Sequence, residues 1–448
     1  MTRSVAKPAN PMLAVLRERN FFLLWLGQGT SLLGDSFHFI ALSWLVLQLT
    51  NADAFALGTV LAVAGIPRAL FMLVGGAITD RFSPRTIMLI SDGVRFLLSG
   101  LIMVLILTGT INLWLLYAIA LLFGFVSAFF QPAAGAIMPA LVPSNELQPA
   151  NSVFQGSAQL VSFIGPVLAG SVIAWFGASS GASRAGTLGL AVAFGIDAFS
   201  FLVSVVTLWL MRIPTAVRAG DDQHAASVLE SIRGGLAFVW NDPLMRWMFV
   251  VIAAANFLFA GPIDVGIPVL AKLRLPEGVA GFGFIIAAYG LGNLIGTVLS
   301  GMISPRRWFK EFTLVLLFAF GLGIAPFGWL PSAWFGVAIF LLLGIGNGYF
   351  SIILITLLQK RTPSEMMGRI MSLLMLANVG LMPISQAFAG AVVNVSLDAL
   401  FIGAGILMLL VALWTTFSPT LGILTSQVEK LAATPPQGAP DQQGQVER

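Results

Sequence analysis

Twelve apolar runs, each roughly 20 residues or longer, constrain the fold of this sequence more than any other feature. A helix that rises 1.5 Å per residue needs about 20 residues to cross the roughly 30 Å hydrocarbon core of a bilayer. Backbone polar groups in lipid must be bonded internally, which leaves only helices or closed barrels. Segment 113–130, LWLLYAIALLFGFVSAFF, is apolar on all sides and does not alternate as a barrel strand would. We therefore predict an all-α polytopic membrane protein.

The predicted spans form two sets of six, separated by a polar segment. The first six lie near 21–49, 56–79, 86–108, 112–132, 151–176 and 186–211, and the second six near 247–271, 280–303, 309–330, 333–358, 366–393 and 398–418. The tail contains ATPPQGAPDQQGQ, a composition typical of disorder. The predicted organisation is an N-terminal cytoplasmic segment 1–20, a first half 21–211, a central cytoplasmic loop 212–246, a second half 247–418 and a cytoplasmic tail 419–448.

The distribution of basic residues predicts that both termini are cytoplasmic. Twelve spans place the termini on one side, and that side carries 18 of the 23 Lys and Arg residues. The other side carries only Arg184, Lys272 and Arg274, while Arg68 and Arg95 fall inside spans. Because basic residues accumulate in cytoplasmic loops, we expect a multi-pass protein of the cell (plasma or inner) membrane. The scattered charges form no single patch, so the net charge of +4 does not indicate nucleic acid binding.

The two halves match each other at an offset of 220 residues. Gly124 falls on Gly344, and Pro143 falls on Pro363. One such match is weak evidence in an apolar chain, but several agree, including charged positions at a neighbouring offset. The matches predict two pseudo-symmetric six-helix halves, which usually enclose a site near the membrane midplane.

The stretch GGAITDRFSPR, at the end of the second predicted span, resembles the G-x3-D-R-x3-R signature of the major facilitator superfamily. Gly76 permits close approach of helices, and Asp80 can cap or pair with a helix end that moves between states. Two arginines of the motif are expected at the lipid interface, and an i, i+3 pair on the third span can meet the motif as a structural or gating network. The predicted gating set is Gly76, Asp80, Arg81, Arg85, Asp92 and Arg95.

More of the chain looks like one branch of that superfamily, the macrolide-efflux and enterobactin-exporter-like proteins, also called transmembrane secretion effectors. The likeness runs from about residue 20 to 415 and includes SLLGDSF, SDGVR, ALVPSNELQPANS and TPSEMMGRIMS. It implies the major facilitator fold and proton-driven export of small amphipathic molecules, such as drugs, macrolides or siderophores. The alternatives are a proton-linked importer of a small metabolite and a membrane receptor or scaffold that transports nothing.

Charged residues inside spans are candidates for proton coupling, because each costs about 2.5 to 3.5 kcal/mol at the membrane centre. Asp35 and Arg68 are both expected near the midplane, so a moving helix could change the proton affinity of Asp35. His38 lies at i+3 from Asp35 and could relay a proton. The alternatives are a permanent Asp35–Arg68 ion pair and a histidine that is only hydrogen-bonded within the bundle. The further in-span acids Asp197 and Asp264 could also bind protons, but packing at a helix end is their favoured role.

Uncharged polar side chains within spans predict the lining of a substrate cavity, with hydrogen bonding between helices as the alternative. In the second half a neutral asparagine aligns with Arg68, so the coupling charge is concentrated in the first half and the second half suits apolar cargo. The candidates are Gln155, Gln159, Asn256, Asn293 and Asn378.

The sequence holds no motif for ATP hydrolysis or for enzymatic chemistry. It has no G-x4-G-K-[ST] phosphate loop, no cysteine, two histidines and no H-E-x-x-H. We therefore predict a secondary transporter that is not an enzyme and that uses no cofactor or metal. Its expected partners are a small-molecule substrate, protons and the lipid bilayer, and it is expected to act as a monomer.

Overall fold

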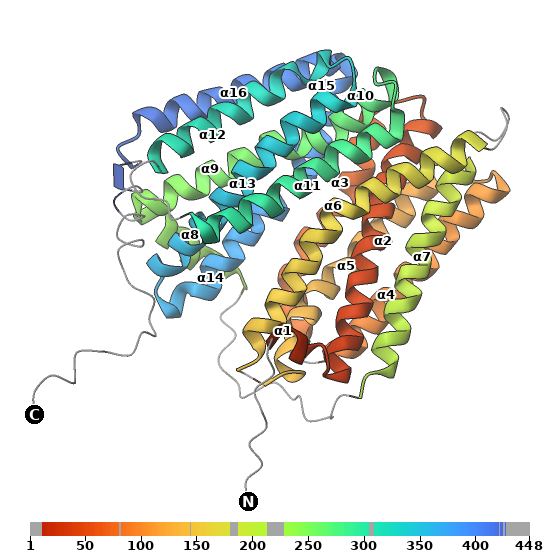
Figure 1. Cartoon of the computed structure of the whole chain (residues 1–448), viewed down its shortest axis with the longest axis horizontal. Helices are drawn as coiled ribbons and strands as arrows, with labels where there is room; N and C mark the ends of the chain where they lie inside the picture. Colours follow the sequence, from red (N-terminus) through yellow and green to blue (C-terminus); the bar gives the residue numbers. More distant parts are fainter. Residues whose placement is uncertain are drawn as a thin grey trace, which may run out of the picture.

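Helices make up the transmembrane part of the protein (Figure 1). Twelve helices are long and apolar enough to span a membrane, and the residues described contain no β-strand, so the all-α prediction and the number of spans are confirmed. Asp80 and Arg81 of the predicted gating motif lie outside the described residues. The computed structural model describes residues 11–79, 82–143, 145–179, 187–212, 228–303, 309–420, 422, 423 and 426.

The first half contains six long helices after a short helix α1 (Pro11–Val15). Prolines lie inside three of them, as spanning helices tolerate when neighbouring groups satisfy the freed carbonyls. The six are α2 (Arg19–Leu49), α3 (Ala54–Thr79), α4 (Pro84–Thr108), α5 (Leu113–Ile137), α6 (Leu147–Ser179) and α7 (Thr187–Leu210), with a 3-10 turn η1 (Met138–Ala140) after α5.

The second half also has six spans, but two of them contain a π-helical stretch. The seventh span is α9 (Pro243–Gly261), η2 (Pro262–Gly266) and α10 (Ile267–Leu273), and the eleventh is α14 (Ser364–Met375), η4 (Leu376–Gly380) and α15 (Met382–Val395). The polar segment that joins the halves contains helix α8 (Val228–Asn241), which the sequence did not predict. The other spans are α11 (Gly278–Met302), α12 (Phe309–Ile324) followed by η3 (Ala325–Trp329), α13 (Ala333–Arg361) and α16 (Leu397–Phe417).

Equivalent helix crossings in the two halves explain the sequence match at an offset of 220. A Cβ atom on Gly124 of α5 would lie 1.9 Å from the carbonyl oxygen of Ala64 on α3. A Cβ atom on Gly344 of α13 would lie 2.4 Å from the carbonyl oxygen of Tyr289 on α11. Only glycine allows backbones to approach this closely, so both halves need it at the same crossing.

The halves pack against each other mainly along two helix pairs, α3 with α15 and α6 with α11. A Cβ atom on Gly58 would lie 2.4 Å from the carbonyl oxygen of Gln386, and one on Gly283 would lie 2.3 Å from that of Pro166. Away from these contacts the halves diverge toward the side of α1, α8 and α14 (Figure 1).

Candidate functional site

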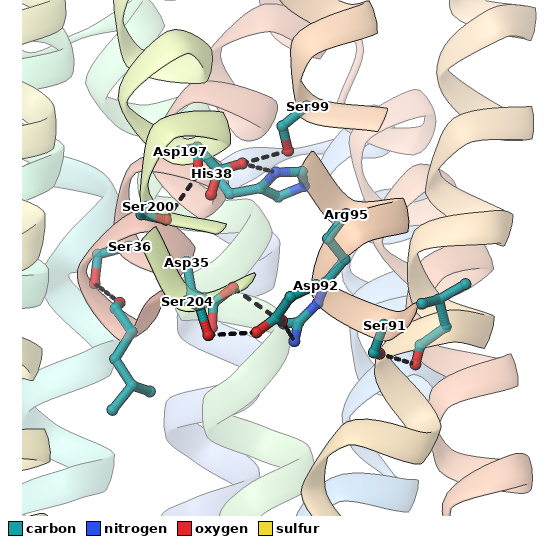
Figure 2. A network of polar contacts seen from close by, with 12 residues as sticks. Asp35, Ser36, His38, Ser91, Asp92, Arg95, Ser99, Asp197, Ser200 and Ser204 are labelled. Atoms are coloured by element: carbon teal, nitrogen blue, oxygen red, sulfur yellow. Dashed lines mark hydrogen bonds and ion pairs between the residues drawn. The ribbon is translucent and has the colours of Figure 1, made fainter. Parts of the chain in front are cut away.

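A cluster of charged side chains lies inside the first half, between α2, α4 and α7 (Figure 2). Arg95 of α4 is only 4% exposed and forms a hydrogen-bonded ion pair with the fully buried Asp92, one helical turn away. Its Nη1 lies 3.9 Å from Oδ1 of Asp35 on α2. Ser204 of α7 donates a hydrogen bond of 2.5 Å to Oδ2 of Asp92. The guanidinium of Arg95 is therefore the counter-charge of two carboxylates from two helices.

Two aromatic rings hold the guanidinium of Arg95 in place. Its Cζ lies 4.3 Å from the ring centroid of Phe130 on α5 and 4.6 Å from that of Phe201 on α7. A cation over aromatic faces is attracted by their quadrupoles, and more strongly where water is excluded. The arginine is thus fixed by four helices, since its partners come from α2, α4, α5 and α7.

A second polar group lies above the arginine in Figure 2 and contains His38 and Asp197. Nδ1 of His38 lies 2.8 Å from Oδ2 of Asp197, and the hydroxyl of Ser99 donates a 2.6 Å hydrogen bond to the same oxygen. The His38 ring stacks on Phe123 with centroids 4.2 Å apart. Asp197 is fully buried in the middle of α7, so the expectation that it packs at a helix end is wrong.

A cavity of about 360 Å³ lies beside the charged cluster, between the two halves. Asp35, His38, Arg68 and Arg95 line it from the first half, and Gln386 is among the residues that line it from the second. The carboxylate of Asp35 is 42% exposed, whereas Asp92 and Asp197 are fully buried and do not line the cavity. Asp35 is therefore the acid of this cluster that a molecule in the cavity can touch.

Two smaller cavities measure about 170 and 270 Å³. The first is lined by the second half alone, and the second is lined mainly by the second half, including Asp264, together with Phe39 of α2. Asn256 of α9 and Asn378 of η4 line both, and Nδ2 of Asn256 donates to Oδ1 of Asn378 at 3.1 Å. The remaining polar groups of the 170 Å³ cavity are hydroxyls and an amide, which come from Tyr289, Thr313, Asn347 and Ser351. The lining of the 170 Å³ cavity therefore offers hydrogen bonds and apolar surface without a charged group.

A family model matches most of the chain and agrees with the architecture described above, which has twelve spans, two matching halves and a cavity between them. The model described as Major Facilitator Superfamily matches residues 24–386. The chain belongs to this superfamily. It is 24% identical over 396 residues to the multidrug efflux pump Tap of Mycolicibacterium fortuitum, covering 87% of this chain and 93% of Tap. It is 27% identical over 339 residues to the enterobactin exporter EntS of Escherichia coli, covering 74% and 76% of the two chains.

Solved structures agree with this fold. A bacterial homologue of the iron transporter ferroportin, in an inward-facing state, aligns with a TM-score of 0.65 at 19% identity, over 89% of this chain and 99% of its own. A POT family transporter in complex with 5-aminolevulinic acid aligns with a TM-score of 0.69 at 12% identity, over 92% and 100%. At such identities the likeness concerns the fold alone. The family model and the sequence relatives make the protein a major facilitator transporter and not an enzyme, as the sequence predicts.

In this facilitator the ion partner of Asp35 is Arg95 and not Arg68. Arg68 is an exposed side chain of the same cavity, and within the described residues it forms no ion pair with Asp35. The sequence did contain a signal for the partner that was missed. Arg95 lies 11 residues beyond Pro84, the first residue of α4, which is about 17 Å of helix and hence deep in the membrane.

The gating motif is described only in part. Gly76 lies in α3, and the Asp–Arg pair that follows lies outside the described residues. Arg85 was expected at the lipid interface, but its Nε and Nη2 each donate a 2.7 Å hydrogen bond to the carbonyls of Leu208 and Trp209. These carbonyls end α7 and have no partner within the helix, so Arg85 caps that helix end. Asp92 and Arg95 form the charged cluster together with Asp35, and their predicted contact with Asp80 lies outside the described residues.

Three of the five predicted cavity residues do not line the cavities described above. Asn293 accepts a 2.9 Å hydrogen bond from Asn347, which joins α11 to α13, so it has the interhelical role that was weighed as its alternative. Gln159 accepts a 3.5 Å bond from Ser162 one turn along α6, and Gln155 is an exposed residue of the same helix. Sequence reasoning missed Asn347, an in-span amide of the same kind that does line a cavity.

One acid of the second half is buried and uses a neutral partner. Asp264 in η2 is 5% exposed, and its Oδ2 accepts a 2.8 Å hydrogen bond from Gln386 of α15. Within the residues described, no three His, Cys, Asp or Glu side chains are grouped to hold a metal ion. Asp264 also lines the 270 Å³ cavity, but Asp35, with a side chain that is 42% exposed, is the more accessible of these two cavity-lining acids.

Proposed function

We propose that this facilitator is a secondary exporter of small amphipathic molecules, which it exchanges for protons by alternating access, with both termini in the cytoplasm. The observation that carries the proposal is the placement of Asp35. It is the one carboxylate of the Asp35–Asp92–Arg95 cluster that is exposed, and it lines the cavity between the halves. A proton and a substrate can both reach it there.

The charge balance of the cluster supports a proton site. Asp92 already has a hydrogen-bonded ion pair with Arg95, and Asp35 lies at the longer distance of 3.9 Å from the same guanidinium. Two carboxylates and one guanidinium leave one negative charge, which is unfavourable in a region of low dielectric. Binding a proton at Asp35 cancels that charge, and so does a substrate that brings a cationic group. The two therefore compete for one group, as antiport requires.

The second half supports the choice of an amphipathic cargo. Its cavities combine amides, hydroxyls and the buried acid Asp264 with apolar and aromatic walls, including Phe259 and Tyr289. Such walls bind bulky apolar molecules and orient them with a few hydrogen bonds. The similarity to the multidrug efflux pump Tap and to the enterobactin exporter EntS favours export over import.

The test is efflux from loaded cells that express the wild type or Asp35→Asn, with and without a protonophore. The panel contains lipophilic cations, macrolides and siderophores. We expect export that the protonophore abolishes and that Asp35→Asn loses. The matched control is Asp398→Asn, which removes an acid whose ion pair with Arg274 lies away from the cavity.

Each other outcome contradicts part of the proposal. Export that survives both the protonophore and Asp35→Asn would exclude proton coupling through Asp35. If cells that lack the protein accumulate less of a solute, the protein is an importer. If solutes bind to the purified protein but none crosses the membrane, it acts as a receptor or scaffold.

A further inference from the structure

An apolar groove of about 440 Å³ lies at the surface of the second half, apart from the substrate cavities. Its walls come from α8, α9, α14, η4 and α15. Four of its residues are large apolar side chains that are more than 40% exposed, which is usual where a helix faces lipid. These four are Leu236, Trp240, Val250 and Ile384.

The groove and the substrate cavities lie on opposite faces of the same two spans. On α9 the groove is lined by Val250 and Ala253, whereas the cavities are lined by Asn256 and other residues. On η4 the groove is lined by Ala377 and Gly380, whereas Asn378 faces the cavities. Because successive helix positions are about 100° apart, this division separates a lipid side from a substrate side.

A single cation lies in the lining of the groove, and it stands beside an aromatic ring. Arg246 is in the first turn of α9, its Nη1 donates a 3.3 Å hydrogen bond to the carbonyl of Trp240, and its Cζ lies 5.8 Å from the indole ring. Within the described residues Arg246 has no acidic partner, since the nearby Asp242 is paired with Arg361 at 2.8 Å. Tryptophan and arginine at the end of a span are typical of the headgroup level of a membrane.

We propose that the groove binds one anionic phospholipid of the bilayer, with its phosphate at Arg246 and an acyl chain along α9 and η4. The charge of Arg246 selects an anionic headgroup, and the walls below it are apolar. Helix α8 forms one wall of the groove and packs on α14, where Arg369 lies against Gly234.

The same binding would give the lipid an influence on the substrate cavity. No residue of η4 is buried, whereas four residues of the other π-helical stretch, η2, are buried. A chain that covers Ala377 and Gly380 supplies the packing that η4 lacks within the protein. Since Asn378 on the same turn hydrogen-bonds to Asn256 at the cavity, the lipid becomes part of the cavity's support.

The test counts bound lipid and does not depend on transport. The purified full-length protein is equilibrated with bilayers of phosphatidylcholine that contain a small fraction of phosphatidylglycerol, and retained lipids are counted by native mass spectrometry. We expect one retained phosphatidylglycerol. Arg246→Gln should lower its retention about two- to fivefold, as an exposed ion pair is worth up to about 1 kcal/mol. Ala253→Trp, which fills the groove, should abolish it.

Two control variants make the result specific to the groove. Arg19→Gln removes an exposed arginine from the start of α2, the first span of the first half. Gly403→Trp places the same indole on α16, where a Cβ atom would meet nothing within 4 Å. Both should retain lipid as the wild type does. Equal losses in the controls, unchanged retention in both groove variants, or full displacement by glycerol phosphate alone would each overturn the proposal.

Discussion

The two halves of this facilitator share a scaffold but differ in the chemistry at their centres. The first half places an arginine, two carboxylates and a histidine–aspartate pair among its helices. The second half places asparagines there, and its buried acid, Asp264, has the neutral partner Gln386. The glycine crossings at Gly124 and Gly344 are nevertheless equivalent. Duplication of a fold therefore fixes the backbone contacts, while the central polar groups diverge with function.

The largest expected effect comes from removing Arg95, the buried cation of the first half. Arg95→Met leaves Asp92 and Asp35 without their counter-charge, and loss of one partner of a buried pair costs about 3 to 5 kcal/mol. We expect a corresponding fall in the free energy of unfolding, measured by titration with denaturing detergent from mixed micelles. Arg68→Met is the matched control, because Arg68 is exposed in the cavity. Equal effects of the two changes would show that Arg95 does not organise the cluster.

The second prediction tests the close helix crossings that the two halves share. A methyl group at Gly124 or Gly344 would overlap a facing backbone carbonyl, so each Gly→Ala change should cost about 1 to 3 kcal/mol through forced separation of the helices. The two costs should be similar. Gly100→Ala is the control, since a Cβ atom there meets nothing within 4 Å, and it should be neutral or stabilising. A cost in only one half would break the equivalence of the crossings.

These comparisons show how far the sequence determines the fold. Apolar run length predicts all twelve spans, because the thickness of a bilayer leaves little freedom in helix length. The repeat at Gly124 and Gly344 also predicts equivalent crossings, since only glycine permits them. The π-helical stretches η2 and η4 were not predicted, because a one-residue shift in hydrogen bonding leaves no mark on an apolar pattern.

The candidate site could be predicted only in part. Charge inside a span identified Asp35, Arg68 and His38 as coupling candidates and placed Arg95 in the gating set, but it could not show which of them meet. The rotation of each helix about its own axis decides whether Asp35 faces Arg95 or Arg68, and that rotation depends on packing across several helices. For the same reason Asn256 could not be told apart from Asn293, although one lines the cavities and the other joins two helices.

A smaller effect is expected from changing an acid to its amide in the second half. In Asp264→Asn the side-chain oxygen can still accept the bond from Gln386, and no cation in the described part of the chain loses a partner. The cost should stay below about 1 kcal/mol, the usual net value of a neutral hydrogen bond. Asp92→Asn makes the same chemical change beside Arg95 and should cost several times more. Denaturant unfolding of both variants decides this, and a larger cost for Asp264→Asn would reverse the contrast between the halves.

The smallest expected effect concerns an ion pair of the second half that lies at the end of its spans instead of the centre. Asp242 caps α9 by accepting hydrogen bonds from the amides of Leu244 and Met245, and Arg361 donates a 2.8 Å bond to its Oδ2. Burial acts to raise the pKa of Asp242, but the bond from Arg361 and the capping bonds outweigh it, so the pKa lies below its usual value.

An acid with a lowered pKa stabilises the folded state above its unfolded pKa of about 3.9, and this stabilisation is lost as the pH falls through the folded value. Asp242→Asn keeps a capping oxygen but loses the charge, so it should cost about 0.5 to 1 kcal/mol at pH 7. Unfolding measured between pH 7 and pH 3 should show the two proteins converging at the acid end. A difference that persists unchanged at pH 3 would mean that the capping bonds, and not the ion pair, carry the effect.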